Sequence, residues 1–178
     1  MENKPSLFQH TMTWGAITGI ILIVFSLVLY LVHQSANQAL GYLSYVLLIA
    51  GIIIGSIAYR DKVLGGFISY KDAFVTGLLI TIFAGILSSF FSFILIRYID
   101  PSVVEQSIAK AEEKMISRGM SEDDVERAME KTKEFIGSPL MVLVGLLSFA
   151  FIGTIISLIT AAIVKKEKGP FDTGAQAV

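Results

Sequence analysis

The chain alternates between long apolar segments and shorter polar ones. Four apolar segments, residues 11–32, 40–59, 73–96 and 140–164, contain no Asp, Glu, Lys or Arg. About 20 helical residues at roughly 1.5 Å each cross a hydrocarbon core of about 30 Å. A helix satisfies its own backbone polarity in lipid, where charged side chains are costly. The pattern therefore predicts an all-α fold, an integral membrane four-helix bundle.

Helix-start signals precede each apolar segment. Three residue pairs have the spacing of a capping box: Ser6 with Gln9, Ser35 with Gln38, and Ser69 with Asp72. The fourth segment follows Ser138-Pro139, a capping residue and a first-turn proline. We therefore predict that the four spanning helices begin at these sites.

The connection between the third and fourth spans, residues 98–138, is the longest polar segment. We expect it to form an extramembrane helical hairpin, in which Asp100-Pro101 starts one helix, Gly119 ends it and Ser121 with Asp124 starts the next. Each helix carries an apolar stripe at helical spacing: Val104, Ile108, Ala111 and Met115, then Val125, Met129, Thr132 and Ile136. The stripes can pack on each other or on the bundle, form a docking surface for another protein, or lie on the bilayer.

Composition supports a single membrane domain over residues 1–178. The chain is 54% hydrophobic and 16% charged, with a net charge of −1 that gives no reason to expect nucleic acid as a partner. It has no cysteine, which excludes disulfides and thiol chemistry.

Basic residues indicate the orientation. One face carries Lys4, Arg60, Lys62, Lys71, Lys165, Lys166 and Lys168, whereas the hairpin connection has six basic and ten acidic residues. Basic residues near spans favour the cytoplasm. We expect both termini in the cytoplasm, including a tail over 165–178, and the hairpin outside.

Catalytic, cofactor and metal sites are not predicted. His10 and His33 fall near opposite membrane faces in this topology, so they cannot share one metal within a monomer, and neither has a second ligand at suitable spacing. Gly65-Gly66 lacks the lysine that should follow in a phosphate-binding loop. We therefore expect no enzyme, with no catalytic, cofactor-binding or metal-binding residues.

Small residues at four-residue spacing occur in every span: Gly15 and Gly19; Gly51 and Gly55; Gly77, Thr81, Gly85 and Ser89; Gly153, Ser157 and Ala161. This spacing lets helices approach closely, either within one chain or in a homo-oligomer. Ser88, Ser89 and Ser92 give the third span its most polar face. We expect these hydroxyls to bond to backbone or neighbouring helices; lining a polar cavity is the alternative.

A longer pattern resembles a known family. A short basic loop leads into Gly-Phe-Ile-Ser-Tyr-Lys-Asp-Ala-Phe-Val-Thr-Gly over residues 66–77, and the third span ends on Tyr-Ile-Asp-Pro over 98–101. From about Pro5 to Lys166 the chain resembles the bacterial membrane proteins of domain of unknown function 4199, found chiefly in the Bacteroidota. The resemblance implies a four-span protein of the bacterial inner membrane and supplies no activity or site residues.

Two functions follow from these expectations. The first is a non-enzymatic protein of the inner membrane that acts by association, with a membrane or periplasmic protein as partner for the hairpin. The alternative is a small transporter or channel subunit formed by oligomerisation around the third span. The lipid bilayer is the one partner common to both.

Overall fold

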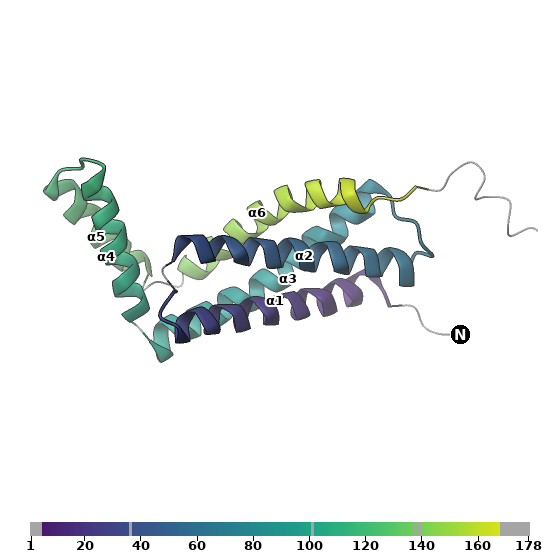
Figure 1. Cartoon of the computed structure of the whole chain (residues 1–178), viewed down its shortest axis with the longest axis horizontal. Helices are drawn as coiled ribbons and strands as arrows, with labels where there is room; N and C mark the ends of the chain where they lie inside the picture. The colour runs from purple at the N-terminus through teal and green to yellow at the C-terminus, as the bar shows by residue number, and fades with distance from the viewer. Residues whose placement is uncertain (1–4, 36, 101, 137, 139, 168–178) are drawn as a thin grey trace, which may run out of the picture.

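The computed structural model describes residues 5–167 except 36, 101, 137 and 139 (Figure 1). The elements run in the order α1 Leu7–Leu31, α2 Gln38–Lys62, α3 Tyr70–Ile94, the π-helix η1 Leu95–Ile99, α4 Ser102–Ser117, α5 Glu122–Ile136 and α6 Leu140–Val164. The predicted all-α fold is confirmed. Lys4, Pro101, Gly137, Pro139, Lys168 and the tail beyond it lie outside the described residues.

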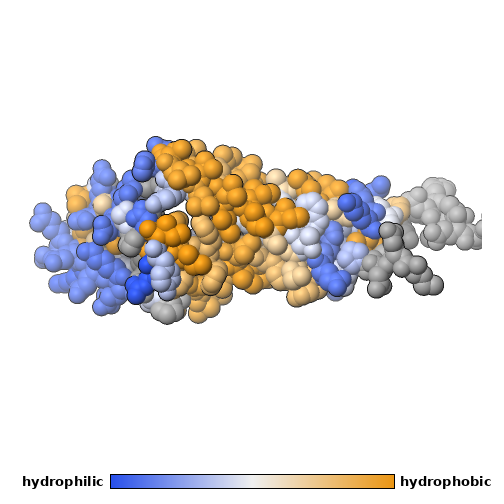
Figure 2. Space-filling model, turned by 90° about the horizontal axis from the view of Figure 1, so that it is seen from below, coloured by the Kyte–Doolittle hydropathy of each residue, from blue (hydrophilic) through white to orange (hydrophobic). Residues whose placement is uncertain are grey.

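Four of these helices form the predicted membrane bundle. α1, the Ala39–Lys62 part of α2, the continuous segment Tyr70–Ile99 and α6 are each long and apolar enough to cross a membrane. They lie side by side in Figure 1, and Figure 2 shows an apolar belt between two hydrophilic ends. The prediction of four spans with a hairpin between the third and fourth is therefore confirmed.

Two of the four predicted helix starts have the expected geometry. At α1, Ser6 Oγ accepts a hydrogen bond from the Gln9 N–H at 3.3 Å, and Gln9 Oε1 accepts from the Ser6 N–H at 3.1 Å. At α3, Ser69 Oγ accepts from the Asp72 N–H at 3.1 Å. Both side chains satisfy backbone donors that a helix leaves free at its first turn.

The predicted cap of the second span is wrong. Asn37, not Ser35, caps α2, because its Oδ1 accepts from the backbone N–H groups of Ala39 and Leu40. Asparagine is as good an N-cap as serine, so the two candidates could not be separated by residue type alone. At the fourth span, Ser138 Oγ donates to the Phe135 carbonyl at 2.7 Å and so faces back toward α5.

Small residues set the distances between the spanning helices. α3 lies between α1 and α6 and packs on both. A Cβ atom on Gly77 would lie 2.9 Å from Ser157 Oγ, and one on Gly153 would overlap Thr81. Gly51 of α2 lies equally close to Thr18 of α1. The predicted close approach through small residues therefore operates within one chain.

The hairpin has a small core of its own. Ile108 of α4 and Val125 and Met129 of α5 are buried together, with Ala111 and Met115 packed against them. The described part of the two stripes therefore packs together, which is the first of the three predicted arrangements, whereas the side chains of Val104 and Ile136 lie outside what the structure describes. Gly119, with φ of 81°, occupies the left-handed region just after α4, as a helix C-terminus favours.

The bundle end opposite the hairpin is closed by polar backbone contacts. Ile68 and Lys166 exchange backbone hydrogen bonds at 2.9 and 3.0 Å, and Arg60 Nη1 donates to the Val164 carbonyl at 3.3 Å. Tyr59, Ile68 and Val164 are buried in one cluster there. These contacts tie α2, the loop before α3 and α6 together at the basic end.

Candidate functional site: a pocket at the hairpin end

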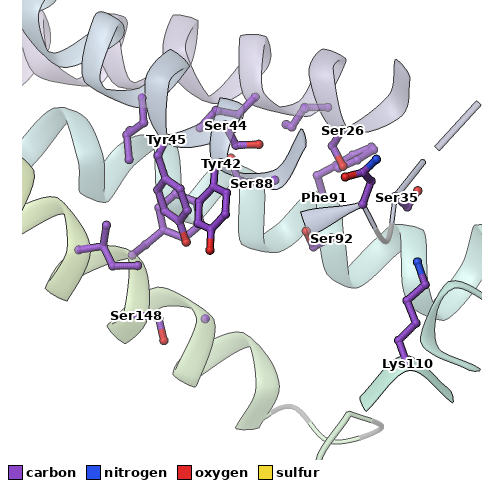
Figure 3. A pocket seen from close by; sticks show the side chains of 18 of the residues that line it. Ser26, Ser35, Tyr42, Ser44, Tyr45, Ser88, Phe91, Ser92, Lys110 and Ser148 are labelled. Atoms are coloured by element: carbon purple, nitrogen blue, oxygen red, sulfur yellow. The ribbon is translucent and has the colours of Figure 1, made fainter. Parts of the chain in front are cut away.

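A half-open cavity of about 820 Å³ lies among α1, α2, α3 and α6, in the half of the bundle nearer the hairpin (Figure 3). This volume falls within the range of roughly 300–1,000 Å³ usual for small-molecule sites. Along α2 the lining runs from Asn37 to Leu48. At about 1.5 Å per residue this is roughly 16 Å, or about half of a 30 Å hydrocarbon core.

The inner part of the pocket is apolar and sealed. Leu22 and Leu48 line it and are 7% and 2% exposed. Both belong to a core cluster with Ile52, Ile80 and Ile156, which fills the centre of the bundle. The cavity therefore enters the bundle from the hairpin end and stops at this core.

Hydroxyl groups line the pocket from all four spans. The lining includes Ser26 on α1, Tyr42, Ser44 and Tyr45 on α2, Ser88 and Ser92 on α3, and Ser148 on α6, with Ser35 in the loop before α2. These residues distinguish the pocket from the lipid-facing surface of the same helices, where large apolar side chains are exposed.

One of these hydroxyls has unused hydrogen-bonding capacity. Hydroxyls in apolar helices commonly bond to a carbonyl one turn back, as Ser148 does to the Val144 carbonyl at 2.8 Å. Among the described residues, Ser88 Oγ is buried and has no hydrogen-bond partner. Ser56 and Ser157 share this state, but neither lines the pocket. Ser88 is therefore a lining residue whose buried hydroxyl no described group satisfies.

The serines of the third span divide between the two predicted arrangements. Ser88 and Ser92 line the cavity, which was the alternative prediction. Ser89 is buried near α6, where a Cβ on Gly145 would lie 3.6 Å from its Oγ. Ser89 therefore lies in the contact between α3 and α6, which is the arrangement expected for all three serines.

The pocket is bounded by α2 on one side and α6 on the other. In Figure 3 the rings of Tyr42 and Tyr45 reach from α2 into the space between the two helices. Tyr42 is 62% exposed and Gly145 adds no side chain on the facing helix. Arg60 joins α2 to the end of α6 at the basic end, and in Figure 3 the two helices are separated at the hairpin end.

Positive charge stands at the mouth of the pocket. Lys110 and Lys114, one turn apart on α4, line it together with Ala111. Lys110 extends its amine toward the end of the cavity where Ser35 and Ser92 lie (Figure 3). No Asp or Glu is among the described lining residues, although the hairpin is acidic as a whole. The side of α4 that faces the pocket is therefore its basic side.

Asp100 fixes the start of α4 beside this mouth. Its Oδ1 accepts a hydrogen bond from the Ser102 N–H at 2.8 Å. Hydrogen bonds from the Ser102 side chain and backbone hold the pKa of the Asp100 carboxyl below its usual value of 3.8, and Tyr30 and His33 lower it further. Since Tyr30 lies in the last turn of α1, this carboxylate links the first span to the base of the hairpin.

The two histidines do not meet. His10 is buried, and its Nε2 donates to the Gly55 carbonyl at 2.9 Å, which joins α1 to α2. His33 follows α1 at the other membrane end and is exposed. Across the described part of the chain, no three His, Cys, Asp or Glu side chains are placed to hold a metal ion.

The comparison with protein families identifies the chain. Residues 13–166 match the family described as Protein of unknown function (DUF4199). The chain belongs to the DUF4199 family. The match spans all four membrane helices and the hairpin, so it confirms the family indicated by the segments 66–77 and 98–101. No curated protein and no solved structure matches the DUF4199 chain.

Several pocket residues of this DUF4199 protein were not predicted as site residues. Tyr42, Lys110 and Lys114 are among them. The sequence signal that was available is the i,i+4 spacing of the two lysines beside Ala111, which places one basic strip on α4. Whether this basic strip faces the pocket depends on how the hairpin packs against the bundle, which the sequence spacing does not specify.

Proposed function

We propose that this DUF4199 protein is a non-enzymatic protein of the bacterial inner membrane that binds a small amphiphilic molecule in the pocket. The observation that carries the proposal is the 820 Å³ cavity, formed within a single chain and lined by hydroxyl groups. Its walls offer hydrogen bonds and apolar contacts, the combination found in ligand sites. Among the described lining residues, no nucleophile is paired with a base, as covalent catalysis would need.

Binding fits this geometry better than conduction. A channel needs a path through the bundle, and the core of Leu48, Ile52 and Ile80 lies below the pocket. The far end is closed by the Ile68–Lys166 pairing. Because one chain already forms the cavity, the pocket does not need the oligomer that the transporter alternative requires. The basic residues at the closed end favour a cytoplasmic location for it and for both termini.

The absence of cysteine allows a clean test. Ser92→Cys puts one thiol in the pocket, and Ser157→Cys puts one in the α3–α6 contact as a matched control. In delipidated protein we expect a small maleimide to label the thiol at position 92 and leave that at position 157 unmodified. An organic extract of the native membranes should slow labelling at position 92. Equal labelling at both positions, or no protection by the extract, would contradict the proposal.

A second candidate function is association through the hairpin. Ile108, Val125 and Met129 are buried in its own core, and residues 98–138 carry a formal charge of −4. This supports a basic partner, a membrane or periplasmic protein, rather than an apolar one. Replacing Glu126, Glu130 and Glu134 of α5 by Gln should release such a partner from protein purified in mild detergent. A complex unchanged by these substitutions would remove this candidate.

A further inference from the structure

The pocket combines three features that together specify a class of ligand. Its inner wall is apolar, with Leu22, Leu48 and Phe149 in the lining. Hydroxyl groups line the part of the pocket between this apolar wall and the two lysines. Among them, the buried Ser88 hydroxyl has no hydrogen-bond partner in the described part of the chain. Lys110 and Lys114 stand at the mouth. An amphiphile with an acyl chain, hydrogen-bond acceptors below the head and an anionic head matches this order.

We propose that the pocket binds an anionic phospholipid, with its phosphate at Lys110 and Lys114 and its ester carbonyls near Ser88 and Ser92. This inference rests on the proposed ligand-binding function and names the class of ligand. The acyl chains would lie against Leu22, Leu48 and Phe149. The depth of the cavity, about half of the hydrocarbon core, matches one leaflet.

The route into the pocket supports a lipid rather than a solute from water. Tyr42 and Tyr45 project into the space between α2 and α6 (Figure 3), and because Tyr42 is 62% exposed we infer that this space is the opening of the pocket. A lipid can enter sideways through this opening without leaving the bilayer. Tyrosine suits the boundary because its ring is apolar and its hydroxyl can reach a head group.

Charge supplies the selectivity among lipids. The described lining residues include two lysines and no carboxylate. A lysine near a membrane surface favours anionic lipid by about 1 kcal/mol, which is roughly a five-fold change in affinity. Two lysines therefore predict a preference of about 25-fold for phosphatidylglycerol over phosphatidylcholine.

Native mass spectrometry of detergent-purified protein titrated with each of these two lipids tests the inference. We expect Lys110→Gln/Lys114→Gln to reduce this preference from about 25-fold to near unity, mainly by weakening phosphatidylglycerol binding, since the choline of phosphatidylcholine offsets its phosphate charge. Lys110→Arg/Lys114→Arg should retain the preference, which separates loss of charge from disturbed folding. Lys131→Gln/Lys133→Gln removes the same charge from α5, on residues that do not line the pocket, and should bind like the unmodified protein.

The outcomes separate the inference from the function on which it rests. Equal binding of both lipids, or a preference unaffected by the Lys110 and Lys114 substitutions, would overturn the inference. Protection of the thiol at position 92 by inorganic phosphate alone would also overturn it, because the site would then take a soluble anion. If the membrane extract still protects that thiol in these cases, the pocket remains a ligand site for another molecule. If the extract gives no protection, the proposed function fails as well.

Discussion

Gly153 of α6 faces Thr81 of α3 so closely that one added methyl group at Gly153 would overlap the threonine side chain. The threonine hydroxyl donates to the Gly77 carbonyl at 3.0 Å, so its rotamer is held. This contact sets the distance between α3 and α6, which pack extensively on each other.

Gly153→Ala should therefore destabilise the bundle. Overpacking of a fixed contact costs typically 1–3 kcal/mol, whereas alanine at an open helix position is tolerated. Gly145→Ala on the same helix is the control, because its Cβ would meet only Ser89 Oγ at 3.6 Å. Thermal unfolding in detergent should show a lower midpoint for Gly153→Ala alone. Equal midpoints for the two variants would mean that α3 and α6 do not meet at Thr81.

His10 should act as a structural donor between α1 and α2. Its buried Nε2 donates to the Gly55 carbonyl, so His10→Ala removes one interhelical hydrogen bond and part of the packing on Tyr59. We expect a loss of about 1–3 kcal/mol in the free energy of unfolding. The exposed His33 has φ of 55°, which asparagine tolerates, so His33→Asn should change stability by less than about 0.5 kcal/mol. A larger effect at position 33 than at position 10 would contradict this assignment.

The hairpin should unfold independently of the spans. Val125 is 4% exposed in the small hairpin core, so Val125→Asp would bury a charge without a partner. We expect amide hydrogen exchange to accelerate across α4 and α5 while α1, α2, α3 and α6 keep their protection. The exposed Glu126→Asp variant provides a neighbouring control. Loss of protection in the spans of Val125→Asp would show that hairpin and bundle fold as one unit.

The start of α4 should loosen in acid. The folded-state pKa of Asp100 lies below its usual value of 3.8, so the stabilisation it gives is present above that value and is lost as the pH falls below it. Exchange of the Ser102 amide, corrected for its intrinsic rate, should therefore lose protection as the pH falls through this range. In Asp100→Asn the same amide should show no such step. A step of equal size in both proteins would assign it to another carboxylate.

The sequence predicts the membrane bundle because its signals are local. A run without charge defines a span, and Ser69 with Asp72 defines a helix start through atoms three residues apart. The same local rules fail where two neighbours compete, as Ser35 and Asn37 do for the cap of α2. They also do not predict that the third helix continues as the π-helix Leu95–Ile99, because i→i+5 hydrogen bonding is not associated with a simple residue pattern.

The pocket could not be predicted in the same way. Its existence depends on α2 and α6 standing apart at one end, which follows from many contacts such as Gly153–Thr81 and Arg60–Val164 rather than from one motif. The serines of α3 are visible in the sequence, but Ser88 and Ser89 face different surroundings only once the helices are placed. Lys110 and Lys114 gain their role from the angle of the hairpin.

The most direct test of the pocket as a ligand site is native mass spectrometry of protein released gently from its own membranes. Ser44→Phe would fill the cavity, whereas Val46→Phe adds the same ring at a position that is 57% exposed and outside the lining. We predict that the unmodified protein and Val46→Phe carry a bound small molecule of defined mass and that Ser44→Phe has lost it. An unmodified protein without a bound molecule, or the same molecule retained by Ser44→Phe, would contradict the account.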